Sequence, residues 1–80
     1  GMQNSQGSVM NSLHRIADGA AEAMEFTVRS TTRYLNVPLK DLRLKSGILI
    51  AVIMRGRDII IPEGSSSIQE GDSVILISWI

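Results

Sequence analysis

The 80-residue sequence contains no cysteine, which excludes a disulfide framework and a thiolate metal or redox site. It contains one histidine, His14, so a His-rich metal site and a catalytic triad both lack their usual residues. Eight basic and eight acidic residues cancel, so no overall positive field is available to attract nucleic acid or an anionic membrane. These absences predict a protein that is not an enzyme, holds no metal and binds no nucleic acid.

Aromatic residues are also few, at 4% of a chain that is 44% hydrophobic, so the expected core is aliphatic. The longest uninterrupted apolar run covers residues 48–54, far fewer than the ~20 residues that a membrane-spanning helix needs. We therefore expect a soluble chain. A single domain of this size buries only ~60–65% of its unfolded surface, which favours stabilisation by a partner surface.

The first eight residues differ in character from the rest. Gly1-Met2 precedes a polar stretch without the apolar segment of a secretion signal. We expect residues 1–8 to be an expression scar and disordered end, and residues 9–80 to form the domain.

The segment of residues 9–16 is compatible with either a helix or a strand. Asp18-Gly19 is a strong hairpin turn signal, and Met24, Phe26 and Val28 then alternate with polar residues at the two-residue period of a half-buried strand. We predict two strands joined at residues 17–19.

Further along, residues 38–42 favour a single helical turn, because Pro38 suits a first helical position and Leu39 and Leu42 share one face. Strands are then expected at residues 48–55, 58–61 and 73–79, separated by turns rich in glycine and proline. The predicted fold class is α+β: a small, mostly antiparallel β-sheet domain with one short helix.

The strand of residues 48–55 is apolar on both faces. It is either buried within one subunit, or covered by a symmetric copy, and the small amount of helix favours the copy and hence a homodimer. At its end, Arg55 and Arg57 flank Gly56. This pair either contacts a phosphate or carboxylate of a ligand or partner, or forms a solvated turn.

Five blocks of sequence carry a family resemblance: residues 19–28, 37–42, 47–55, 60–62 and 68–75. In order and spacing they resemble the TrkA C-terminal domain of Trk-type potassium uptake regulatory proteins, which is the second lobe of the RCK unit. The resemblance runs from about Val9 to the end of the chain.

The resemblance implies a regulatory, ligand-sensing and dimerisation domain of a cytoplasmic subunit that controls potassium uptake through a Trk or Ktr transporter. Such subunits lie peripheral to the inner face of the membrane. They carry an N-terminal Rossmann lobe and act on a membrane potassium transporter subunit. An alternative is the same module appended to another transporter, such as a cation/proton antiporter or an anion symporter.

In some relatives the dimer cleft of this lobe holds cyclic di-AMP. By position, the resemblance places Leu49, Ile50 and Arg55 in such a ligand site, for cyclic di-AMP or another nucleotide. Relatives that use this cleft carry an Asn-His pair shortly after the arginine, whereas residues 60–62 are Ile-Ile-Pro here. No other cofactor is expected in this part of the protein.

Overall fold

The computed structural model describes residues 8–79. The prediction of an expression scar and disordered end therefore falls mostly on residues 1–7, outside the described residues. Ser8, which we had assigned to that end, is the first residue of a strand.

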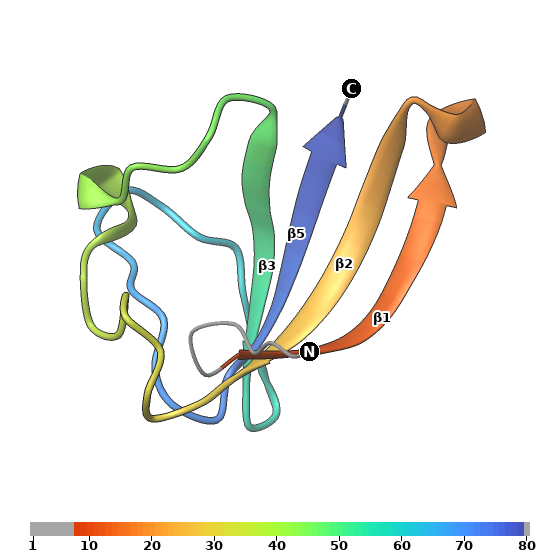
Figure 1. The fold of residues 1–80 in the computed structure, drawn as a ribbon. Helices are drawn as coiled ribbons and strands as arrows, with labels where there is room; N and C mark the ends of the chain where they lie inside the picture. The colour runs from red at the N-terminus through yellow and green to blue at the C-terminus, as the bar shows by residue number, and fades with distance from the viewer. Residues whose placement is uncertain (1–7, 80) are drawn as a thin grey trace.

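Five strands form one antiparallel sheet in the order β1-β2-β5-β3-β4 (Figure 1). The strands are β1 Ser8–Ile16, β2 Ala21–Val28, β3 Ile48–Arg55, β4 Asp58–Ile60 and β5 Ser73–Trp79. The predicted antiparallel sheet is confirmed.

The first hairpin joins β1 to β2, so residues 9–16 form a strand and not a helix. Its connection, η1 (Ala17–Gly19), is a tight turn in which Asp18 has φ 55° and Gly19 has φ 86°. Asp and Gly adopt this left-handed conformation more readily than other residues, which is why the Asp-Gly pair marks the turn.

The single helical turn predicted at residues 38–42 is present only as a 3-10 turn of three residues, so the short helix of the predicted α+β class is corrected to a turn. The described chain contains only 3-10 turns, here η2 (Leu39–Asp41), and Pro38 and Leu42 on either side are extended. A single turn is too short to propagate as a helix by itself. This one is held by the neighbouring loop, because Leu39 N–H donates to Ser66 O at 2.8 Å and Lys40 N–H to Gly64 O at 2.9 Å. The fold is therefore a β-sheet domain with connecting loops.

The two faces of the sheet are covered differently. Successive side chains of a strand point to opposite faces, so the register assigns each residue to one face. The core face carries Phe26, Val28, Val74, Leu76, Ile50 and Ile53. The open face carries Ala21, Ala23, Leu49, Val52, Met54, Ile75, Ile77 and Trp79.

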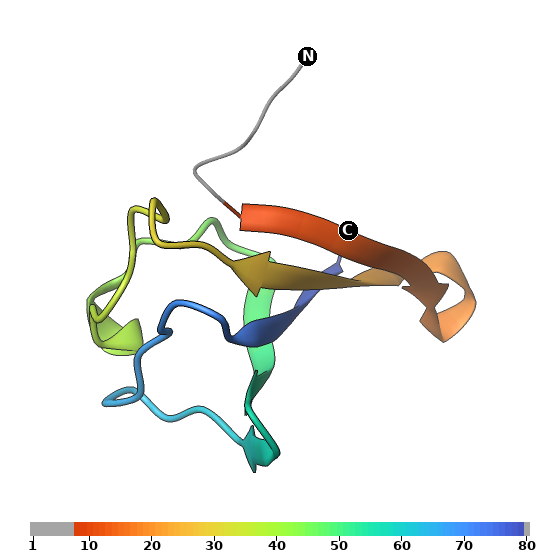
Figure 2. The same cartoon turned by 90° about the horizontal axis from the view of Figure 1, so that it is seen from below.

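Two long loops, residues 29–47 and 61–72, lie on the same side of the sheet (Figures 1 and 2). They cover the core face, where Ile68 packs with Val28, Val74 and the fully buried Ile53. A β-bulge between Ile50 and Val52 shifts the register of β3. For this reason Ile50 and Ile53, an odd number of residues apart, both face the core.

Gly47 fits tightly where β3 begins. It has φ +84°, and a Cβ atom built there would lie 3.1 Å from the carbonyl oxygen of Trp79. Gly71 has a similar φ of +89° with open space around it. We expect Gly47→Ala to lower the free energy of unfolding by about 2 kcal/mol and Gly71→Ala by about 1 kcal/mol, because both strain the backbone and only the first also crowds β5. Denaturant unfolding measures both, and equal losses would show that the contact with Trp79 costs nothing.

Candidate functional site

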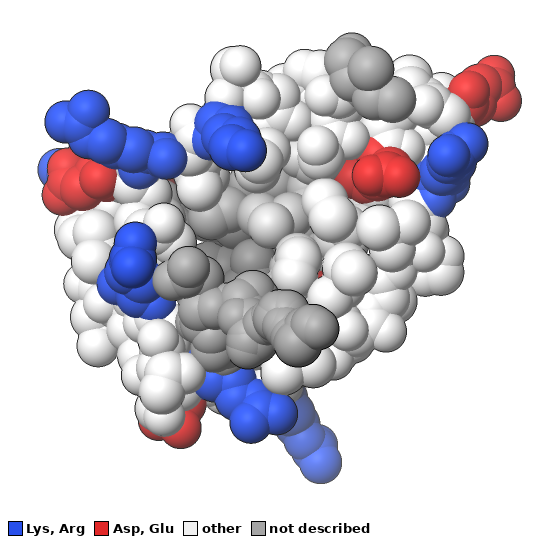
Figure 3. Space-filling model, viewed as in Figure 1, with Lys and Arg blue, Asp and Glu red and all other residues white. Residues whose placement is uncertain are grey.

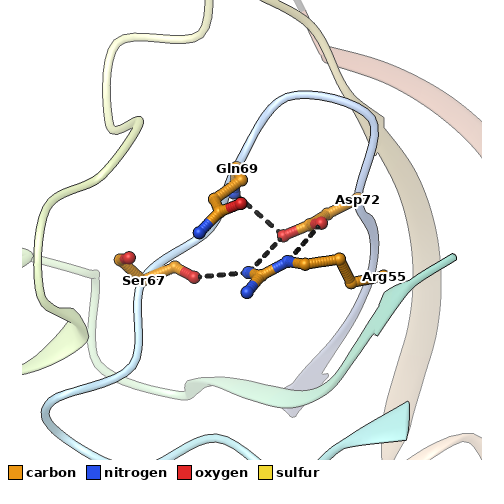
Figure 4. Close-up of polar contacts among 4 residues, drawn as sticks. All are labelled: Arg55, Ser67, Gln69 and Asp72. Atoms are coloured by element: carbon orange, nitrogen blue, oxygen red, sulfur yellow. Dashed lines mark hydrogen bonds and ion pairs between the residues drawn. The ribbon is translucent and has the colours of Figure 1, made fainter. Parts of the chain in front are cut away.

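Arg55 and Asp72 form a bidentate ion pair at one end of the core face (Figure 4). Arg55 Nε donates to Asp72 Oδ1 at 2.9 Å, and Arg55 Nη2 donates to Asp72 Oδ2 at 2.8 Å. Arg55 Nη2 also donates to the carbonyl oxygen of Ser67 at 2.9 Å, and the backbone N–H of Gln69 donates to Asp72 Oδ2 at 2.8 Å. The guanidinium therefore ties β3 to the loop that precedes β5.

The strand arrangement brings these two residues together. Arg55 is the last residue of β3, and Asp72 lies immediately before β5, which pairs with β3 in antiparallel fashion. The Asp72 side chain caps its own turn through Gln69 N–H, a bond that short acidic side chains commonly make. The Asp72 side chain is 1% exposed, so its charge is stabilised by these hydrogen-bond partners and not by water.

The hydrogen bond to Asp72 raises the pKa of Arg55 above its ordinary value, and the charges of Asp72 and Asp58 act in the same direction. A raised pKa in the folded state adds stability that is present below the unfolded pKa and is lost only as pH rises through the folded pKa. Arginine already titrates far above neutrality. The contribution of Arg55 to stability should therefore not change through neutral and moderately alkaline pH.

The three residues predicted for a ligand site lie in different surroundings. Leu49 is on the open face and 51% exposed. Ile50 is on the core face and lines a cavity. Arg55 is engaged by Asp72 and Ser67. The structure does not bring the three side chains to one surface of the described chain.

Sequence reasoning missed Asp72, which lies in the segment between the strands predicted at residues 58–61 and 73–79. An acidic residue directly before an apolar strand, together with an arginine at the end of another, was the available signal. Antiparallel neighbours place such ends side by side.

The open face is a second candidate, as a surface for a macromolecule. Leu49, Trp79 and Ile59 are 51%, 51% and 71% exposed, and Ile59 pairs with Met54 at the edge of this face. Exposed apolar side chains that are contiguous on a sheet mark interaction surfaces. The open face also carries the acidic residue Glu25, which accepts a hydrogen bond from Ser73 Oγ at 3.2 Å.

Other chemistries find little support among the described residues. Residues 8–79 hold no group of three or more His, Asp or Glu side chains that could bind a metal ion. Within that range, no helix has the length and hydropathy required to cross a membrane. In the view of Figure 3, Lys and Arg side chains stand in separate groups and not in one continuous basic patch.

A family model and individual relatives both match this chain, and they indicate the same family. The model of the TrkA-C domain matches residues 23–78. The Trk system potassium uptake protein TrkA homolog 1 of Methanosarcina mazei is 33% identical over 72 residues, which is 90% of this chain and 16% of that protein. The Trk system potassium uptake protein TrkA of Haemophilus influenzae is 32% identical over 74 residues, 89% of this chain and 16% of that protein. The chain thus spans about one sixth of the length of the curated relatives it matches.

Proposed function

We propose a regulatory function in potassium uptake for this chain, which belongs to the TrkA-C domain family. In this proposal it is the ligand-sensing and dimerisation domain of a cytoplasmic subunit that controls a Trk or Ktr transporter from the inner face of the membrane. The names of the relatives support potassium uptake over the alternative of an antiporter or anion symporter. Their greater length leaves room for the N-terminal Rossmann lobe of such subunits.

The open face is the observation that carries this proposal. A small domain that leaves one face of its sheet apolar and exposed gains stability when a second copy covers that face. Leu49 and Trp79 would lie within such an interface, since both are half exposed on the same face. The homodimer therefore forms through β3 and β5.

Regulation follows from the geometry of two paired copies. A ligand that binds two relative orientations of the copies unequally shifts the equilibrium between them. A linked transporter subunit then experiences that shift as a change in its gate equilibrium. Sensing of this kind requires no catalytic residue.

The family resemblance assigns Leu49, Ile50 and Arg55 to a ligand site for cyclic di-AMP or another nucleotide. Ile50 faces the core cavity, so the proposed contacts with the ligand are those of Leu49 and Arg55. Leu49 contributes apolar contact at the interface. Arg55 supplies a cation for phosphate, but its ion pair with Asp72 must first break, or the guanidinium must bind Asp72 and the phosphate together. Nucleotide binding should therefore compete with the Arg55–Asp72 ion pair.

Self-association tests the proposal. We expect Leu49→Asp to raise the dissociation constant of the dimer by about 100-fold or more, because a two-fold interface would bury two unpaired carboxylates. Sedimentation across a range of protein concentrations measures this constant. Leu44→Asp is the matched control, since Leu44 is similarly exposed, at 44%, but lines the cavity of the core face.

A chain that stays monomeric at high concentration, or equal effects of the two substitutions, would remove the basis for an open-face dimer. The same measurement repeated with cyclic di-AMP, ATP and NADH tests the ligand. A dimer that tightens with one of them supports sensing at this interface. A dimer indifferent to all three contradicts the nucleotide site and leaves an assembly function.

A further inference from the structure

A cavity of about 320 Å³ lies on the core face, between the sheet and the loop of residues 29–47. The buried residues Val28, Val74 and Ile68 form its deepest lining. Tyr34 and Leu44 are its most exposed lining residues, at 42% and 44%. The cavity is therefore apolar in its depth and accessible from the loop side.

The polar groups of this cavity are hydroxyls. Thr32 is 8% exposed, and its Oγ1 lies 3.1 Å from Ser8 Oγ and accepts a hydrogen bond from Arg29 N–H at 3.3 Å. No charged residue is among the described residues that line the cavity. A charged group placed there would lose its hydration without gaining a counter-ion, which disfavours charged ligands.

We propose that this cavity binds a small, uncharged, mainly apolar molecule of roughly ten non-hydrogen atoms, with one hydroxyl directed at Thr32 and Ser8. The volume falls at the lower end of the ~300–1,000 Å³ range of ligand pockets, and a cavity of ~150 Å³ already holds benzene.

The site differs from the proposed nucleotide site. Ile50 is assigned to both, but Leu49 lies on the opposite face, and Arg55 is bonded to Asp72 and is not among the described lining residues. A charged nucleotide does not suit a cavity without cations. Binding here also leaves the open face free, so the two proposals succeed or fail separately.

The probes are cyclohexylmethanol and cyclohexanecarboxylate, which share a ring and differ in charge. They are titrated into the 80-residue protein while backbone amide shifts are followed by NMR. We expect saturable shifts at Val28, Ile50 and Leu76 with the alcohol, and binding of the carboxylate at least about tenfold weaker, because only the carboxylate must be desolvated.

Two variants that narrow the cavity check its location. Leu76→Phe adds side-chain volume at the sheet. Leu44→Trp adds side-chain volume at an exposed position, so this variant remains available if Leu76→Phe does not fold. Each is expected to weaken binding of the alcohol by about tenfold or more. Ile61→Trp, at a position that is 70% exposed and outside the described lining, is the matched control and should leave binding unchanged.

Several results would overturn the proposal. They are the absence of saturable shifts, equal affinity for the two probes, shifts centred on Leu49 and Trp79, or displacement of the alcohol by cyclic di-AMP. Loss of alcohol binding as the protein self-associates would identify a second copy as the occupant. Binding that occurs only after deletion of residues 1–7 would identify that segment of the chain.

Discussion

Replacing Ile53 with alanine is expected to lower the free energy of unfolding by about 3–4 kcal/mol. Ile53 is 0% exposed and lies opposite Val74 on one side and Ile60 on the other. Truncation removes buried methyl groups and leaves a cavity between strands that the hydrogen-bonded sheet prevents from closing. An 80-residue domain has little stability to lose, so part of the population should unfold at physiological temperature.

Ile59→Ala is the matched control, because Ile59 lies on the adjacent strand β4 and is 71% exposed. Its cost should stay below about 0.5 kcal/mol. Denaturant unfolding measures both variants, at a protein concentration too low for self-association. Similar losses at the two positions would mean that the core is not centred on Ile53.

The strands could be predicted from local sequence because turn residues separate short, apolar, β-branched runs. The Asp18-Gly19 turn and the alternation of Met24, Phe26 and Val28 specified the first hairpin. The 3-10 turn at residues 39–41 could not be distinguished from a short helix, since its local pattern is helical. Its contacts with Ser66 and Gly64 come from a distant part of the chain.

The orientation of β3 side chains was beyond sequence reasoning for another reason. Residues 48–54 are all apolar, so a shift of one residue in register exchanges one apolar set for another. The bulge between Ile50 and Val52 makes that shift, and it determines that Ile53 faces the core and Met54 the open face. The resemblance to the family assigned Leu49 and Ile50 to one candidate site, whereas the alternation of side chains along β3 puts them on opposite faces of the sheet.

Asp72→Ala is expected to lower the free energy of unfolding by about 3 kcal/mol. Asp72 is 1% exposed, and the substitution leaves Gln69 N–H without its acceptor. It also removes the counter-ion of the Arg55 guanidinium, which keeps only its hydrogen bond to Ser67 O. Asp58→Ala is the control, because Asp58 is exposed and its charge also acts on Arg55. It should cost less than about 0.5 kcal/mol. Thermal unfolding compares them, and equal losses would mean that the buried ion pair contributes no more than a surface charge.

Because Arg55 and Asp72 form an ion pair, a test of Arg55 must also account for Asp72. Arg55→Met alone removes a cation that a nucleotide needs and also leaves the buried carboxylate of Asp72 uncompensated, so loss of a ligand response would be ambiguous. Combining Arg55→Met with Asp72→Asn removes both charges and keeps an acceptor for Gln69 N–H. We expect the double variant to lose less stability than the sum of the single variants. If this double variant dimerises but no longer responds to the nucleotide, Arg55 acts on the ligand. If it retains the response, the contribution of Arg55 is confined to holding β3 against the loop before β5.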